Sequence, residues 1–310
     1  MKIFNIILIF ILYFNVYPSF SSNDFNLVPI KVSNNVFVFV GANEDINNKN
    51  GGAISNTGFI IGDDSILVID AGPSYIYASN VIEIIKSFSD LPIKYLVVTH
   101  HHADHSFGIS RYLEMDVEII MAPAELKRYL KYGNRSLKQL RDLIGEEWFL
   151  DTKINSFQYK EKKYPVSLNL GNRNILIELY EKGHSDGDLI IKDKISSTLF
   201  VGDLVFSGRA PTIPHANINN WKNYIDLISK KNWNYLIPGH GNIIKNKDEL
   251  LPTKNWITFI DKTAKEASIS GISALEIFNE GLPDFIKEYK LAKETWYRDL
   301  PILINKYEFD

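Results

Sequence analysis

Short apolar runs alternate with helical patterns along most of the chain. Many of the runs are continuously apolar, which is typical of strands in sheets that are covered on both faces. They predict strands at residues 36–40, 58–62, 66–70, 93–99, 118–121, 166–168, 175–180, 189–191, 198–201 and 235–237. Apolar positions at three- and four-residue spacing predict helices at 76–88, 123–145, 219–230 and from 250 to the end. Strands and helices in both halves fit an α/β fold, a four-layer αββα sandwich.

The N-terminus carries the pattern of an export signal. A basic residue precedes the apolar segment 3–14, and a small-x-small site that ends at Ser21 follows it. The segment is shorter than the roughly 20 residues of a membrane-spanning helix, so we expect cleavage, with an uncleaved anchor as the alternative. The protein would then be periplasmic or secreted and would contact the membrane only during export. The predicted organisation is a signal peptide at 1–21, a main domain at 22–250 and a C-terminal helical extension, packed on that domain, at 251–310.

Charge and cysteine content narrow the chemistry. The 310-residue chain has a formal net charge of −3 and no cysteine. A near-neutral chain offers no basic excess for nucleic acid. The absence of cysteine excludes disulfides, thiolate zinc sites and cysteine nucleophiles. Any metal site must therefore consist of His, Asp and Glu side chains.

The strongest local motif follows the strand predicted at 93–99. Four of the seven histidines lie within six residues there, together with Asp104. His100 and His102 are two residues apart, so in an extended turn they point to the same side. Asp104 and His105 are adjacent, and a loop can direct them to a second point. Imidazole and carboxylate are the zinc ligands used without thiolate, so this loop predicts two ligands for each of two metals.

Three later strands end in a glycine followed by a residue that can bind a metal. These pairs are Gly183-His184, Gly202-Asp203 and Gly239-His240. Glycine lets the backbone turn sharply and approach an ion closely. Each pair alone is typical of an ordinary turn. Together with the histidine motif after the strand predicted at 93–99, they make four strand ends with such side chains, which predicts one shared site at one edge of the sheets.

The motifs His-x-His-x-Asp-His, Gly-His, Gly-Asp and Pro-Gly-His-Gly, in this order, resemble the signature of the metallo-β-lactamase superfamily over residues 30–250. The resemblance implies two zinc ions. The ligands it implies are His100, His102 and His184 for one zinc, Asp104, His105 and His240 for the other, and Asp203 for both.

Two further residues are candidates for the site. Asp70 matches the Asp-x-Gly element of the superfamily, which implies a group that orients a ligand histidine; capping of the turn before Gly72 is the alternative. His215 lies in the segment between Asp203 and the helix predicted from 219. That loop is expected to line the pocket, with His215 as a candidate substrate contact. His101, at the variable position of the motif, is expected to be solvated or packed.

The resemblance also implies an activity. The chain would be a zinc-dependent hydrolase in which a metal-bridging hydroxide attacks an ester, thioester or amide-type bond of a small molecule, with Asp104 as the catalytic residue that accepts its proton. The segments 56–62, 66–72 and 202–221 resemble the exported quinoprotein relay system zinc metallohydrolases, which implies a periplasmic quinoprotein dehydrogenase as a partner. That branch normally has Thr after the third ligand histidine, where this chain has Ser185.

Three other functions stay open. A mononuclear iron persulfide dioxygenase has the same fold and holds one Fe with two His and one Asp, but the additional presence of His102, Asp104, His105 and His240 favours two metals. β-Lactamases with a cysteine ligand are excluded, which leaves β-lactam hydrolysis as a side activity. A non-catalytic periplasmic partner of a quinoprotein is the third, and the intact set of ligands argues against it.

Overall fold

The computed structural model describes residues 25–213 and 215–309, and the predicted signal peptide at 1–21 lies outside them. The first half of the chain forms one sheet, in which neighbours along the chain pair with each other. Pairing is antiparallel up to β4 and parallel from β4 through β6. The strands are β1 (Ile30–Ser33), β2 (Val36–Phe39), β3 (Thr57–Ile61), β4 (Ile66–Ile69), β5 (Ile93–Val97) and β6 (Glu118–Ile120).

The second half forms the other sheet, in the order β11-β10-β9-β8-β7. Only β10 and β11 are parallel in this sheet, because α5 connects them across its face. The strands are β7 (Val166–Asn169), β8 (Asn174–Glu181), β9 (Gly187–Asp193), β10 (Thr198–Phe206) and β11 (Tyr235–His240).

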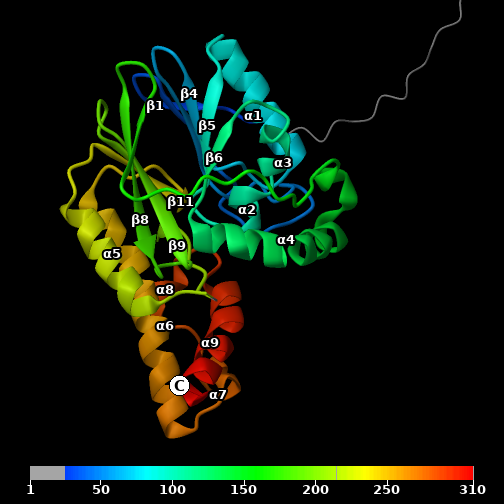
Figure 1. Ribbon diagram of the computed structural model, residues 1–310. Coiled ribbons are helices and arrows are strands. Elements are labelled where there is room, and N and C mark those ends of the chain that lie inside the picture. Colours follow the sequence, from blue (N-terminus) through cyan, green and yellow to red (C-terminus); the bar gives the residue numbers. More distant parts are fainter. Residues whose placement is uncertain (1–24, 214, 310) are drawn as a thin grey trace, which may run out of the picture.

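Helices cover the outer face of each sheet (Figure 1). The first sheet carries α1 (Tyr75–Phe88), α2 (Ala103–Ser106), α3 (Ile109–Tyr112) and α4 (Pro123–Ile144). The second sheet carries α5 (Ile218–Lys230) and α6 (Leu251–Ser270). Beyond them lie α7 (Ala274–Glu280), α8 (Asp284–Lys287) and α9 (Ala292–Phe309). The predicted four-layer αββα sandwich is confirmed.

Three apolar clusters hold the layers together. The central one joins the inner faces of the two sheets through side chains such as Val97 and Ile177. A second packs α1 and α4 on the first sheet, and a third packs α5, α6 and α9 on the second. Every residue of β3, β4 and β10 is buried. This burial on both faces explains why these strands are continuously apolar in the sequence.

Two details differ from the expectation from sequence. The strand predicted to end at Val201 continues to Phe206, so Asp203 lies inside β10. The pairing of β10 with β11 shifts at Gly202, which has a φ of +51°, so the strand bends there without ending. The second detail is β1, which the pattern did not predict because its first two residues are exposed and its apolar alternation is short.

The C-terminal helices continue the outer core of the second sheet. Trp256 of α6 and Trp296 and Leu300 of α9 are buried in the same cluster as the residues of α5 and β10. Among the helices of the described residues, none has both the length and the apolar character to cross a bilayer.

One buried ion pair joins the two sheets at the edge opposite the histidine loops. The guanidinium of Arg173 donates to both carboxylate oxygens of Asp193, at 3.1 and 2.6 Å. It also donates to the carbonyls of Ile61 and Asn34 in the first sheet. Both charged residues are buried. Burial raises the pKa of Asp193, but hydrogen bonds from Arg173 and Ser196 outweigh it and lower the pKa.

Replacing Arg173 with Met should therefore destabilise the fold. The substitution leaves the charge of Asp193 buried and unpaired, which costs about 3–5 kcal/mol of unfolding free energy. Urea denaturation measures it. The matched control is Lys94→Met, because Lys94 pairs with Asp64 at the exposed surface and such pairs contribute about 1 kcal/mol or less. Equal losses in the two variants would contradict a special role for the buried pair.

Candidate metal centre

The seven predicted ligands meet at one edge of the sandwich, between the two sheets. The loop after β5, with the start of α2, carries His100, His102, Asp104 and His105. The second sheet supplies the others: His184 in the turn between β8 and β9, Asp203 inside β10 and His240 at the last position of β11. Local glycines permit these approaches. A Cβ on Gly239 would lie 1.9 Å from Asp203 Oδ1, so only glycine leaves room for that carboxylate.

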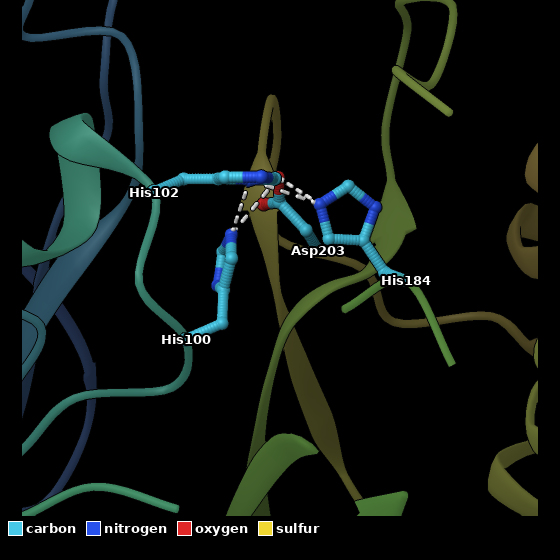
Figure 2. A group of neighbouring side chains, drawn as sticks. All are labelled: His100, His102, His184 and Asp203. Atoms are coloured by element: carbon cyan, nitrogen blue, oxygen red, sulfur yellow. Dashed lines mark hydrogen bonds and ion pairs between the residues drawn. The ribbon is translucent and has the colours of Figure 1, made fainter. Parts of the chain in front are cut away.

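The first group consists of His100, His102, His184 and Asp203. One donor atom from each lies within 4.8 Å of the others. Figure 2 shows the three imidazoles directed toward one another and toward the carboxylate. His102 Nδ1 lies 2.9 Å from His100 Nε2 and 3.2 Å from His184 Nε2. Asp203 Oδ2 lies 3.6 and 3.3 Å from the same two Nε2 atoms.

The second group consists of Asp104, His105 and His240, whose donor atoms also lie within 4.8 Å of one another. Asp104 Oδ2 is 3.6 Å from His105 Nε2 and 3.4 Å from His240 Nε2. Asp203 Oδ1 lies 3.2 Å from His105 Nε2 and 3.3 Å from His240 Nε2. Asp203 thus presents one oxygen to each group, and the structure brings together all seven residues in the arrangement that the sequence predicts.

The donor set fits a bound cation at each group. Asp203 Oδ1 and His105 Nε2 are buried and have no hydrogen-bond partner among the described residues, although buried polar atoms are nearly always satisfied. Burial lowers the pKa of His184 to about 4. Burial and the neighbouring histidines also lower the pKa values of His100 and His102 well below their usual range. These imidazoles are therefore neutral, which is the form that binds metals.

Negative charge surrounds His105. Burial lowers its pKa, but Asp104, Asp203 and Asp70 outweigh this and raise the pKa well above its usual range. The surroundings of His105 therefore favour a positive charge. A divalent cation supplies it and leaves the imidazole neutral as a ligand.

Asp70 holds His105 from behind. Its carboxylate accepts hydrogen bonds from the Thr99 backbone N–H at 2.7 Å and from the Thr99 hydroxyl at 3.0 Å. His105 Nδ1 donates to Asp70 Oδ2 at 2.8 Å, which directs Nε2 toward the second group. Asp70 has a φ of +59°, uncommon for a residue with a side chain. The structure therefore gives Asp70 the contact expected of an orienting residue.

Glu125 of α4 was not predicted from the sequence. It is fully buried and accepts hydrogen bonds from the backbone N–H groups of His101 and Gly187 and from His101 Nδ1, at 2.9, 3.0 and 2.5 Å. It thereby ties the histidine loop to the start of β9. His101, expected to be solvated or packed, is packed against it. No local motif marks Glu125, because α4 is rich in charged residues.

Residues 207–213 and 215–217 form another wall of the site. His215 is exposed, and its Nδ1 lies 3.5 Å from His102 Nε2, so it stands at the mouth of the first group. Arg209 is buried, donates to the Glu44 carbonyl and lies 3.4 Å from His240 Nδ1. The sequence analysis assigned no role to Arg209.

The C-terminal helices brace this segment. Asp299 of α9 accepts a hydrogen bond from the Ile213 backbone N–H at 2.9 Å. The carbonyl of Lys290, between α8 and α9, accepts one from the Ala210 N–H at 2.9 Å. The position of this wall therefore depends on Lys290 and Asp299, which come after the last strand of the second sheet and after α6 in the chain.

The sandwich and its two adjacent groups of His and Asp donors define a metal-binding αββα protein. Residues 50–240 match the family model described as Metallo-beta-lactamase superfamily, and this chain belongs to that superfamily.

Relatives are consistent with this membership, and a solved structure shares the fold. The human protein named acyl-coenzyme A thioesterase MBLAC2 is 24% identical over 217 residues, which cover 61% of this chain and 73% of that protein. A metallo-beta-lactamase type 2 from Bacillus sp. (strain 170) is 24% identical over 202 residues, 63% of this chain and 70% of that protein. The structure of a metallo-beta-lactamase from Pontibacter korlensis matches with a TM-score of 0.60 at 16% identity, over 75% of this chain and 99% of that chain.

Substitution of Gly239 by Ala should disrupt the centre. The new methyl group would lie 1.9 Å from Asp203 Oδ1 and 2.8 Å from the Asp203 nitrogen, so the shared carboxylate must move. Elemental analysis after equilibration with zinc should show fewer than two ions per chain. Gly271→Ala is the control: its φ of +65° makes the substitution strained, but the strain lies at the end of α6 and nothing lies within 4 Å of the added methyl group, so the zinc stoichiometry should match the unchanged protein. Full zinc content in Gly239→Ala would refute the argument.

Metal removal should lower the thermal stability. The donors come from both sheets, so a cation bound in the folded state links them, and at 100 times its Kd it adds about 2.7 kcal/mol. Differential scanning calorimetry should show a lower Tm after chelation and recovery with zinc. The variant His215→Ala, which lies outside both groups, should recover equally. An unchanged Tm on chelation would show that the groups do not bind zinc tightly.

Proposed function

We propose that this protein is an exported, di-zinc hydrolase that cleaves the thioester bond of a small acyl substrate. The observation that carries the proposal is the pair of donor groups that share Asp203 at one open edge of the sandwich. The similarity to acyl-coenzyme A thioesterases from Homo sapiens and Gallus gallus, at 24% and 25% identity, directs the choice of bond.

The chain provides a complete set of residues for two ions. His100, His102 and His184 would hold one, and Asp104, His105 and His240 the other, with Asp203 between them. When bound, zinc ions supply Lewis acidity and make a water molecule nucleophilic near neutral pH.

Residues of the chain itself supply the other functions. Asp104 is the proposed proton acceptor: its side chain keeps 12% exposure, whereas those of His105 and Asp203 are almost fully buried. Its Oδ2 can accept the proton of the attacking water at the floor of the site. Asp70 and Glu125 hold the histidine loop in place, which fixes where Asp104 points.

A β-lactam is the second candidate substrate. The Bacillus metallo-beta-lactamase is 24% identical to this chain, which favours testing it. The chain has no cysteine, which excludes the β-lactamases that use a cysteine ligand. We therefore rank the thioester first.

Export and the quinoprotein pathway stay predictions. Export rests on residues 1–21, and the pathway rests on the segments 56–62, 66–72 and 202–221.

Metal content and turnover of one preparation test the proposal. We expect about two zinc ions per chain and chelator-sensitive hydrolysis of butyryl-coenzyme A, with slower turnover of a β-lactam and of a phosphodiester. A faster β-lactam reaction would favour the second candidate. One iron per chain, with oxygen uptake on a persulfide and no hydrolysis, would replace the proposal with the dioxygenase.

The variant Asp104→Asn tests the proton acceptor. Loss of a general base lowers kcat by about 10²- to 10⁴-fold. Zinc content is measured in the same sample, because Asp104 is also a candidate ligand. Asp116→Asn, an exposed carboxylate outside the site, should leave kcat unchanged. Full activity of Asp104→Asn with two zinc ions would exclude this role.

A further inference from the structure

A groove of about 470 Å³ runs between α2 and α4 and opens beside the first group of donors. Figure 1 shows α2 lying along α4. His102 belongs both to the groove lining and to the first group, and His215 stands at the same end. A ligand that fills the groove therefore reaches the centre where the thioester would be cleaved.

One face of α4 forms the opposite wall. Arg128, Tyr132, Arg135 and Gln139 line the groove at spacings of four, three and four residues, which places them on one side of a helix. The two arginines are seven positions apart, which corresponds to about 10 Å along the helix axis. The wall thus presents cationic and polar groups along a length that exceeds one small functional group.

The charge of the groove is positive. None of the described residues that line it is acidic. Asp186 pairs with Arg128 from outside the lining, which fixes that guanidinium and offsets its charge. Arg135 is exposed and has no ion pair or hydrogen bond among the described residues. Its charge is therefore available to a ligand.

The chemistry of the wall indicates the class of ligand. A guanidinium presents several donors in a plane, which suits the oxygens of a phosphate. The phenol of Tyr132 and the amide of Gln139 add neutral hydrogen-bonding groups between and beyond the arginines. Phe107 and Tyr129 add apolar surface to the lining. Such a mixture fits an elongated molecule with an uncharged arm and an anionic end.

We propose that the groove between α2 and α4 binds the phosphate-bearing thiol carrier of the thioester substrate, with Arg135 contacting a phosphate and the carrier arm lying along Tyr132 toward His102. This inference rests on the proposed function. Beyond that function, it specifies where the thiol leaving group binds and that Arg135 recognises it. The acyl chain then lies outside this groove.

Kinetics with two thioesters test the assignment. Butyryl-coenzyme A carries the phosphates, and butyryl-N-acetylcysteamine has the same thioester without them. The variant Arg135→Gln should raise KM for the coenzyme A thioester about 5- to 10-fold and leave its kcat unchanged. Neither parameter should change for the N-acetylcysteamine thioester. Equal effects on both substrates, or no effect on either, would overturn the proposal.

A control separates a local contact from a change in overall charge. Lys127 is an exposed cation of α4 that does not line the groove. Lys127→Gln removes the same charge from the same helix and should change KM less than twofold. An effect as large as that of Arg135→Gln would overturn the contact. A thioester whose acyl chain ends in a carboxylate is tested as a further substrate. If Arg135→Gln impairs hydrolysis of that substrate alone, the groove binds the acyl group and the proposal fails.

Binding of free coenzyme A to metal-stripped protein distinguishes failure of the groove from failure of the proposed function. Calorimetry should give a Kd that rises about 5- to 10-fold in Arg135→Gln and rises with salt. If binding depends on Arg135 but the zinc-loaded protein hydrolyses no thioester, the proposed groove is supported and the proposed thioesterase function is refuted. If both thioesters are hydrolysed with equal efficiency and coenzyme A does not bind, the thioesterase function is supported and the proposed groove is refuted.

Discussion

The carboxylate of Asp203 is buried between the two sheets and faces the imidazoles of four histidines from both halves of the chain. Burial raises the pKa of this carboxyl, but His240, His105 and His100 outweigh it and hold the pKa well below its usual range. A buried charge is costly unless opposite charge and hydrogen bonds surround it. The arrangement of strand ends, the bend of β10 at Gly202 and the absence of a side chain at Gly239 all serve this one group.

The ligands could be predicted because they lie within or shortly after apolar strands and three of the seven directly follow a glycine, so the signal is local in the sequence. Glu125, Arg209 and Asp299 could not, since each acts through a contact with a distant residue. Their partners His101, His240 and Ile213 lie 24, 31 and 86 residues away. The same limit explains the error at β10: the pattern shows a glycine that can end a strand, and only the pairing with β11 shows that the strand goes on.

Helix α4 combines two functions at successive positions along its length. Glu125, near its start, holds the histidine loop and the start of β9. Arg128, Tyr132 and Arg135, further along, form the wall of the groove. A helix is stiff over this length, so a shift that widens the groove also moves Glu125 and, through it, the loop with His100 and His102. The groove proposed for the leaving group and the donor residues of the first group are therefore mechanically linked.

The brace on the segment 207–217 has a consequence for how this protein can diverge. The superfamily match ends at residue 240, yet Lys290 and Asp299 hold the backbone of Ala210 and Ile213. A new loop sequence must fit helices that lie outside the shared domain. A loop grafted here from another protein must therefore fit α9 and the segment before it. A mutation in α9, on an element that carries none of the seven donor residues, can thus shift the loop beside the donor groups.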